Sequence, residues 1–99
     1  MIALDQLTVD DFAPTLGETY ALDLDGQGTL EFTLLEARRL GDGLDGARDP
    51  FALVFRGPLD PQLEQRTYGI EHPRLGRLLF FIVPIAREAD GMRYEAIFG

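Results

Sequence analysis

Hydrophobic and polar residues alternate with a period of two along most of the chain from Thr19 onward. Tyr20, Leu22 and Leu24 are separated by Ala21 and acidic residues, and Leu30, Phe32 and Leu34 repeat the pattern after Gly26-Gln27-Gly28. A period of two places alternate side chains on opposite faces of a strand. With four later runs, the pattern predicts six strands, over residues 20–24, 30–34, 51–56, 65–71, 75–85 and 93–98.

Glycine and proline mark the joins between these strands. Gly26-Gln27-Gly28 predicts one hairpin and Asp90-Gly91 another, because glycine and aspartate suit tight turns. Residues 41–49 have no apolar period and predict a loop. Leu35 breaks the alternation, so either that strand is covered on both faces or a bulge shifts its register. Pro84 cannot donate to a ladder and is expected at a strand end or a bulge.

A short helix is predicted before the first strand, near residues 8–13. Thr8 followed three residues later by Asp11 is typical of a capping box. Pro14 is expected to end this helix, since proline cannot continue the hydrogen-bond ladder.

The fold class predicted is mainly β: a single small domain over residues 1–99, with about six mostly antiparallel strands and one N-terminal helix. Short turns favour pairing between successive strands, so we expect a meander closed into a small barrel or folded into a tight sandwich. Strand 75–85 is apolar on both faces and is expected to be central. The predicted core comprises Leu22, Leu30, Phe32, Leu34, Phe51, Leu53, Phe55, Phe80, Ile82 and Phe98.

Composition excludes several classes of function. The 99 residues include no cysteine and no serine, which removes thiol nucleophiles, disulfides and serine hydrolase chemistry. A net charge of −8 would repel a phosphate backbone, so nucleic-acid binding is disfavoured. The longest apolar run, residues 78–86, is too short to span a membrane, and the start has no basic signal region. We therefore expect a cytoplasmic protein that binds neither nucleic acid nor membrane.

Two acidic loops are candidate metal sites. Residues 23–28 begin like a calcium loop, but Gln27 replaces one carboxylate and Leu34 stands where a bidentate glutamate is needed. Residues 41–46 supply one copy of a glycine-aspartate repeat that works only when stacked. No glycine-rich phosphate motif is complete either. We expect no metal and no cofactor.

Four polar residues are the candidates for a binding site. His72, the only histidine, follows Glu71 and precedes Pro73, which predicts a histidine in a turn and not a catalytic base. Arg56 ends an apolar strand, where it can pair with an acid of this chain or of a partner. No catalytic residues are assigned. If the protein binds a small ligand or is an enzyme, a pocket at the barrel mouth lined by Arg56, Tyr68, Glu71 and His72 is the alternative hypothesis.

Several segments together carry a resemblance: Leu16-Gly17, residues 51–58, Thr67-Tyr68, residues 71–73, Leu75-Gly76, Val83-Pro84 and residues 94–98. With these segments the chain resembles a family of small bacterial proteins of unknown function, often encoded near phage-tail-collar (microcystin-dependent-type) proteins. The resemblance implies a part in a tail-like assembly and assigns no catalytic residue. We therefore expect a non-enzymatic protein-binding or assembly module with a protein partner, and a homo-oligomer stays open.

Overall fold

The computed structural model describes residues 7–43 and 48–99. The elements in chain order are α1 (Val9–Phe12), the 3₁₀ helix η2 (Ala13–Thr15), β1 (Thr19–Asp23), β2 (Thr29–Arg39), β3 (Phe51–Gly57), β4 (Arg66–His72), β5 (Gly76–Glu88) and β6 (Gly91–Phe98). All six predicted strands are present, and the bounds differ from the predicted ones by a few residues at the ends. No described helix has the length and apolar character needed to cross a membrane.

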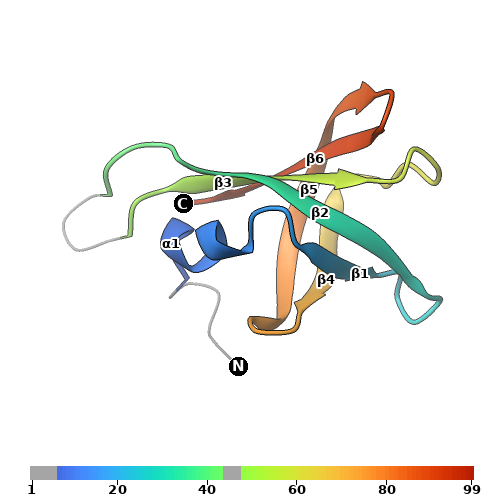
Figure 1. Cartoon of the computed structure of the whole chain (residues 1–99), viewed down its shortest axis with the longest axis horizontal. Coiled ribbons are helices and arrows are strands. Elements are labelled where there is room, and N and C mark those ends of the chain that lie inside the picture. The colour runs from blue at the N-terminus through green and yellow to red at the C-terminus, as the bar shows by residue number, and fades with distance from the viewer. Residues whose placement is uncertain (1–6, 44–47) are drawn as a thin grey trace.

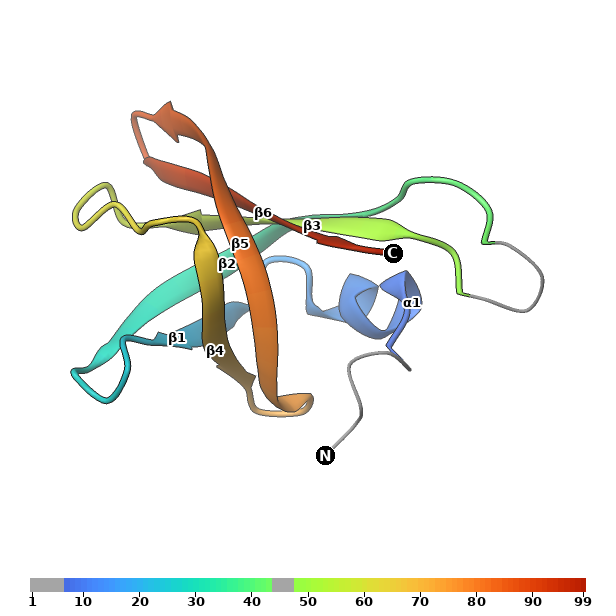
Figure 2. The same cartoon turned by 180° about the vertical axis from the view of Figure 1, so that it is seen from behind.

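The strands form a closed antiparallel barrel in the order β1-β2-β3-β6-β5-β4 (Figures 1 and 2). The barrel therefore consists of two three-stranded meanders, β1-β2-β3 and β4-β5-β6. The prediction of one continuous meander is wrong, because β3 pairs with β6 and not with β4. The connection of residues 58–65 carries the chain from one meander to the other. Of the two architectures left open, the barrel is confirmed.

Two irregularities in the register lie where the sequence predicted them. The pairing of β2 with β3 shifts between Leu34 and Glu36, so Leu35 is a bulge residue and not a residue covered on both faces. The pairing of β5 with β6 shifts between Pro84 and Ala86. Bulges bend strands and increase their twist, which helps a small sheet to close on itself.

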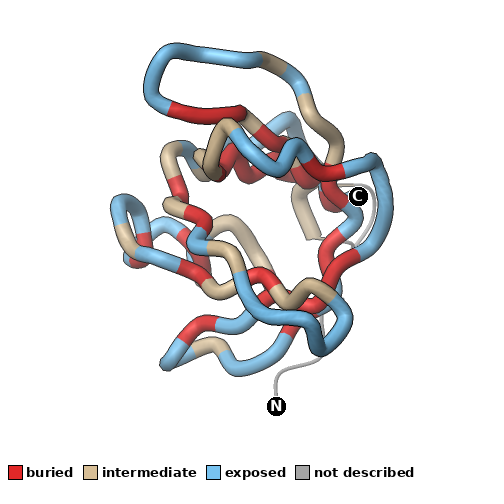
Figure 3. The backbone as a smooth tube through the Cα atoms, turned by 90° about the vertical axis from the view of Figure 1, so that its right-hand side faces the viewer, coloured by how far each residue is buried: buried red, intermediate tan, exposed pale blue. Residues whose placement is uncertain are grey.

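Buried residues alternate with more exposed ones along much of β1, β2, β5 and β6, whereas β3 is buried at every position from Phe51 to Phe55. Figure 3 shows these buried and exposed positions along the backbone. Nine of the ten predicted core residues are buried, whereas Leu30 is only partly buried. The prediction that strand 75–85 is central with both faces covered is wrong for its outer face. Leu79 and Phe81 on β5 are 58% and 51% exposed. The closed barrel gives β5 a neighbouring strand on each side, but its outer face stays open to solvent at Leu79 and Phe81.

The N-terminal helix is present and shorter than predicted. The Asp11 carboxylate accepts hydrogen bonds from the Thr8 backbone N–H at 2.7 Å and from the Thr8 hydroxyl at 3.3 Å, as the capping motif predicts. Pro14 lies in η2, after the last α-helical residue. The helix matters because Phe12 is fully buried against the rings of Phe51, Phe80 and Phe98.

The last hairpin also differs slightly from its prediction. Glu88 pairs with Gly91, so Ala89 and Asp90 form the two-residue turn and Gly91 already belongs to β6. The strand begins at a glycine because its φ is 146° and a Cβ atom there would collide with the Gly57 carbonyl oxygen.

Candidate functional site

Aromatic rings fill the interior of the barrel. Neighbouring centroids lie 4.6 to 6.0 Å apart, in a connected set made of Phe12, Tyr20, Phe32, Phe51, Phe55, Phe80, Tyr94 and Phe98. These distances are those of directly packed rings. Tyr94 also accepts a hydrogen bond from the Leu63 backbone N–H at 2.8 Å, which fixes the 58–65 connection to the core. A partner or ligand therefore has to use the outer surface.

The four candidate residues do not converge on one pocket. Glu71 and His72 line the same hollow, of about 610 Å³. Arg56 lines a second hollow beside Asp90, and Tyr68 lines a third beside the β1–β2 turn. The four residues therefore line three separate hollows and not the single pocket at the barrel mouth that the alternative hypothesis expects. Arg56 on β3 and the buried Tyr68 on β4 line different hollows.

His72 is the buried member of a hydrogen-bonded cluster that includes Glu18 and Arg74. It is 4% exposed, and its Nε2 lies 2.8 Å from Glu18 Oε1. Its Nδ1 accepts the Arg74 backbone N–H at 3.1 Å, so the proton of the neutral ring must be on Nε2, which donates to Glu18. The ring also packs against Tyr20, with centroids 4.7 Å apart. A general base needs a free nitrogen aimed at a substrate. Both nitrogens of His72 are engaged, which supports the structural role predicted for it.

The cluster continues from Glu18 and Tyr20 toward the helix. Glu18 also accepts a hydrogen bond from Arg74 at 2.8 Å, and the hydrogen bonds from His72 and Arg74 lower the pKa of its carboxyl. The Tyr20 hydroxyl lies 2.7 Å from the Thr15 hydroxyl, which donates to the Phe12 carbonyl. Burial raises the pKa of Tyr20. Sequence reasoning missed Glu18 because its partner is 54 positions away and no local pattern links the two.

We expect Glu18→Gln to weaken the acid dependence of stability. With its pKa lowered by folding, Glu18 binds its proton more tightly in the unfolded chain, so the free energy of unfolding falls as pH drops below the ordinary value of 4.5. Urea titrations from pH 6 to pH 3 should give a shallower decline for Glu18→Gln than for the wild type. Glu88→Gln is the control, since the Glu88 side chain has no ion pair among the described residues. If the free energy of unfolding of Glu18→Gln fell with pH as steeply as that of the wild type, the prediction would be contradicted.

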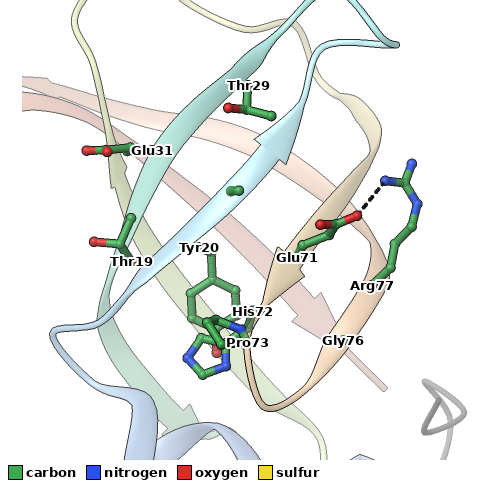
Figure 4. A pocket seen from close by; sticks show the side chains of 10 residues that line it. Thr19, Tyr20, Thr29, Glu31, Glu71, His72, Pro73, Gly76 and Arg77 are labelled. Carbon is green, nitrogen blue, oxygen red and sulfur yellow. Dashed lines mark hydrogen bonds and ion pairs between the residues drawn. The ribbon is translucent and has the colours of Figure 1, made fainter.

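Glu71 lies outside the barrel although it is adjacent to His72, as expected for neighbours on a strand. Its cross-strand neighbour on β1 is Ala21, whose neighbour on β2 is Glu31. Glu31 and Glu71 lie on either side of β1 in Figure 4. The Ala21 side chain between them is small, so a hollow forms there. Arg77 reaches Glu71 at 3.3 Å and Asp23 at 3.2 Å. The hollow is thus lined by acidic and hydroxyl groups together with the Arg77 guanidinium.

Arg56 and Tyr68 have partners of their own. Arg56 lies 3.6 Å from Asp90, which also pairs with Arg93 at 2.9 Å and has a lowered pKa because of Arg93. The Tyr68 hydroxyl donates to the Glu64 carbonyl at 3.0 Å, and its ring lies under the Arg66 guanidinium. Burial raises the pKa of Tyr68. Both residues hold loops against strands.

Within residues 7–43 and 48–99, no group of three or more acidic or histidine side chains is placed to hold a metal ion. The Asp23 carboxylate accepts the Gly26 backbone N–H at 2.9 Å, and this bond and Arg77 lower its pKa. Asp25 pairs with Arg66 at 2.7 Å. The 23–28 segment is therefore a polar hairpin turn, as expected. The second acidic loop lies partly outside the described residues, which include Gly43 and its hydrogen bond to Asp49.

Large apolar side chains are exposed on the outer face of β5 and β6. Leu79 and Phe81 occupy alternate positions on β5, and Val83 follows them. Val83 pairs with Glu95 on β6, and Ile97, two residues further on the same face, is 62% exposed. We call Leu79, Phe81, Val83 and Ile97 the outer apolar face. Exposed apolar groups gathered on neighbouring strands are typical of surfaces that bind other proteins.

Fold and surface together define a small, closed, six-stranded antiparallel barrel with a filled aromatic interior. Residues 7–98 match the family described as "Domain of unknown function (DUF6916)". Because the match covers nearly the whole chain, the chain belongs to that family. Searches of curated proteins and of solved structures found no match. The expectation of a family of unknown function is thereby confirmed.

Proposed function

We propose that the chain is a non-enzymatic module that binds another protein through its outer apolar face. The observation that carries the proposal is the exposure of Leu79, Phe81 and Ile97, at 58%, 51% and 62%, in a domain of only 99 residues. The interior is filled with aromatic rings, and the one histidine is fully engaged in hydrogen bonds. A small-ligand binder or enzyme has less support, because the polar residues expected to serve it line separate hollows.

The proposed partner is a different protein of basic character and not a second copy of this chain. Each copy has a net charge of −8, so two copies repel one another, whereas a basic protein is attracted. We further propose that this takes place in the cytoplasm of a bacterium during assembly of a phage-tail-like particle. That context is supported by the resemblance of the sequence segments quoted above.

The test is affinity capture from the native host with tagged wild-type protein and tagged Phe81→Glu. Leu16→Glu is the matched control, because Leu16 is exposed to a similar degree, 48%, but lies outside the outer apolar face. We expect a protein that wild type and Leu16→Glu retain and Phe81→Glu loses. The retained protein is then purified and its dissociation constant measured by calorimetry.

The same titration separates the proposal from an enzyme or ligand pocket beside His72. His72→Gln should bind the captured protein within about threefold of the wild type, a difference below roughly 1 kcal/mol. Capture of no protein by the wild type, or equal capture by Phe81→Glu, would contradict the proposed function. A loss of a hundredfold or more in folded His72→Gln would instead favour the pocket.

A further inference from the structure

The two meanders of the barrel are joined along two lines of very different length. On one side, β3 and β6 are registered over seven residue pairs, from Phe51 with Phe98 to Gly57 with Met92. On the other side, β1 and β4 are registered over only two pairs, Ala21 with Glu71 and Leu22 with Ile70. We call this second line the β1–β4 seam. Backbone hydrogen bonds therefore close the barrel weakly at this one place.

The short register has a cause in the sequence. Continued in one direction, it would place Thr19 opposite Pro73, which has no N–H to donate. In the other direction β1 ends at Asp23, where the chain turns away into the β1–β2 hairpin. The remaining length of the seam is bridged by side chains.

Three ion-paired contacts cross the seam, and their charges are segregated. Each acid belongs to the β1 side: Glu18 precedes the strand, Asp23 ends it and Asp25 follows it. Each cation belongs to the β4–β5 hairpin. The pairs are Glu18 with Arg74 at 2.8 Å, Asp23 with Arg77 at 3.2 Å, and Asp25 with Arg66 at 2.7 Å. His72 adds a hydrogen bond to Glu18 at 2.8 Å.

Gly69 is what allows the middle contact to form. Arg77 is on β5 and must pass over β4 to reach Asp23 on β1. A Cβ atom built on Gly69 would collide with the Arg77 guanidinium, so the guanidinium occupies the space that a side chain at position 69 would fill. Glu71 on β4 supports Arg77 from the side, at 3.3 Å.

We infer that the β1–β4 seam is the line along which the barrel opens, with Glu18, Asp23 and Asp25 and their partners acting as a polar latch. Water screens exposed ion pairs and reduces their contribution to stability, so the latch is weaker than a ladder of strand hydrogen bonds. Opening leaves both meanders intact and uses the β3–β6 junction as the hinge. It also exposes two unpaired strand edges, the part of a β protein that accepts an extended strand of a partner.

The test is native-state amide hydrogen exchange followed by NMR, in the full chain. In the wild type, the amides of Ala21 and Glu71, which face each other across the seam, should be less protected than those of Leu53 and Ala96 at the β3–β6 junction. Gly69→Ala displaces the flexible end of Arg77 and should speed exchange at the seam about tenfold or more. Exchange at the β3–β6 junction should change less than about threefold.

Asp23→Asn is the second variant, in case Gly69→Ala folds poorly, and it removes the negative charge from the same ion pair. Asp90→Asn is the matched control, since Asp90 pairs with Arg93 and Arg56 at the β5–β6 hairpin, away from the seam. Raising the salt concentration to about 0.5 M should also speed exchange at the seam of the wild type, because salt screens exposed pairs. Equal protection at the seam and at the β3–β6 junction, or an equal response to Asp90→Asn, would overturn the inference.

Discussion

Replacing Phe80 with alanine should lower the free energy of unfolding by about 3–5 kcal/mol, the usual cost of removing a fully buried phenylalanine. Phe80 is 0% exposed and contacts the rings of Phe12, Phe55 and Phe98. It therefore joins the helix, β3 and β6 through one side chain on β5. Such a loss is a large part of the stability of an ordinary small domain, so the variant should be partly unfolded at 37 °C.

Phe81→Ala is the matched control for this change. The two residues are adjacent, have the same side chain and lie on the same strand, but Phe81 is 51% exposed on the outer face. We expect Phe81→Ala to cost less than about 1 kcal/mol. Urea unfolding followed by circular dichroism measures the free energy of unfolding of both variants. Similar losses in the two variants would show that β5 does not direct Phe80 inward and Phe81 outward.

Gly91→Ala should cost about 2–4 kcal/mol, through a disfavoured backbone conformation and a steric collision together. Gly91 begins β6 with a φ of 146°, and an added Cβ would meet the Gly57 carbonyl oxygen and the Arg56 side chain. The carbonyl oxygen cannot move easily, because Gly57 is the last residue of β3 and is paired with Met92.

Gly28→Ala separates the two contributions. Gly28 also has a positive φ, 122°, but no atom lies within 4 Å of a Cβ built there. It should therefore show only the backbone cost, about 1–2 kcal/mol. Thermal unfolding of the two variants gives the comparison. If Gly28→Ala were as destabilising as Gly91→Ala, the close approach of β6 to the end of β3 would not be the cause.

Much of the local structure could be predicted from the pattern of residues alone. Alternation in residues 20–24 and 30–34 located a hairpin, because one buried face requires a period of two. Leu35 and Pro84 marked the two irregular positions, since one interrupts that period and the other has no N–H. Thr8 and Asp11 located the start of the helix through hydrogen bonds between residues three positions apart.

The pairing of the two meanders could not be predicted in this way. The preference for sequential neighbours favours β3 beside β4, yet β3 pairs with β6. Nothing local distinguishes these arrangements, because every strand has an apolar inner face that could pack in either. The same limit explains why strand 75–85 was expected to be covered on both faces. Its outward leucine and phenylalanine indicate either a buried face or an interaction surface.

The sequence by itself determined the strands, the turns, the single domain, the acidic charge and the absence of thiol and serine chemistry. These properties depend on residue type and on spacing over a few positions. Only the tertiary structure decided that His72 is held by Glu18, that Arg77 crosses a glycine to reach Asp23, and that Arg56 and Tyr68 lie apart. Each of these depends on which residues the closed barrel brings together across tens of positions, and no local pattern encodes that choice.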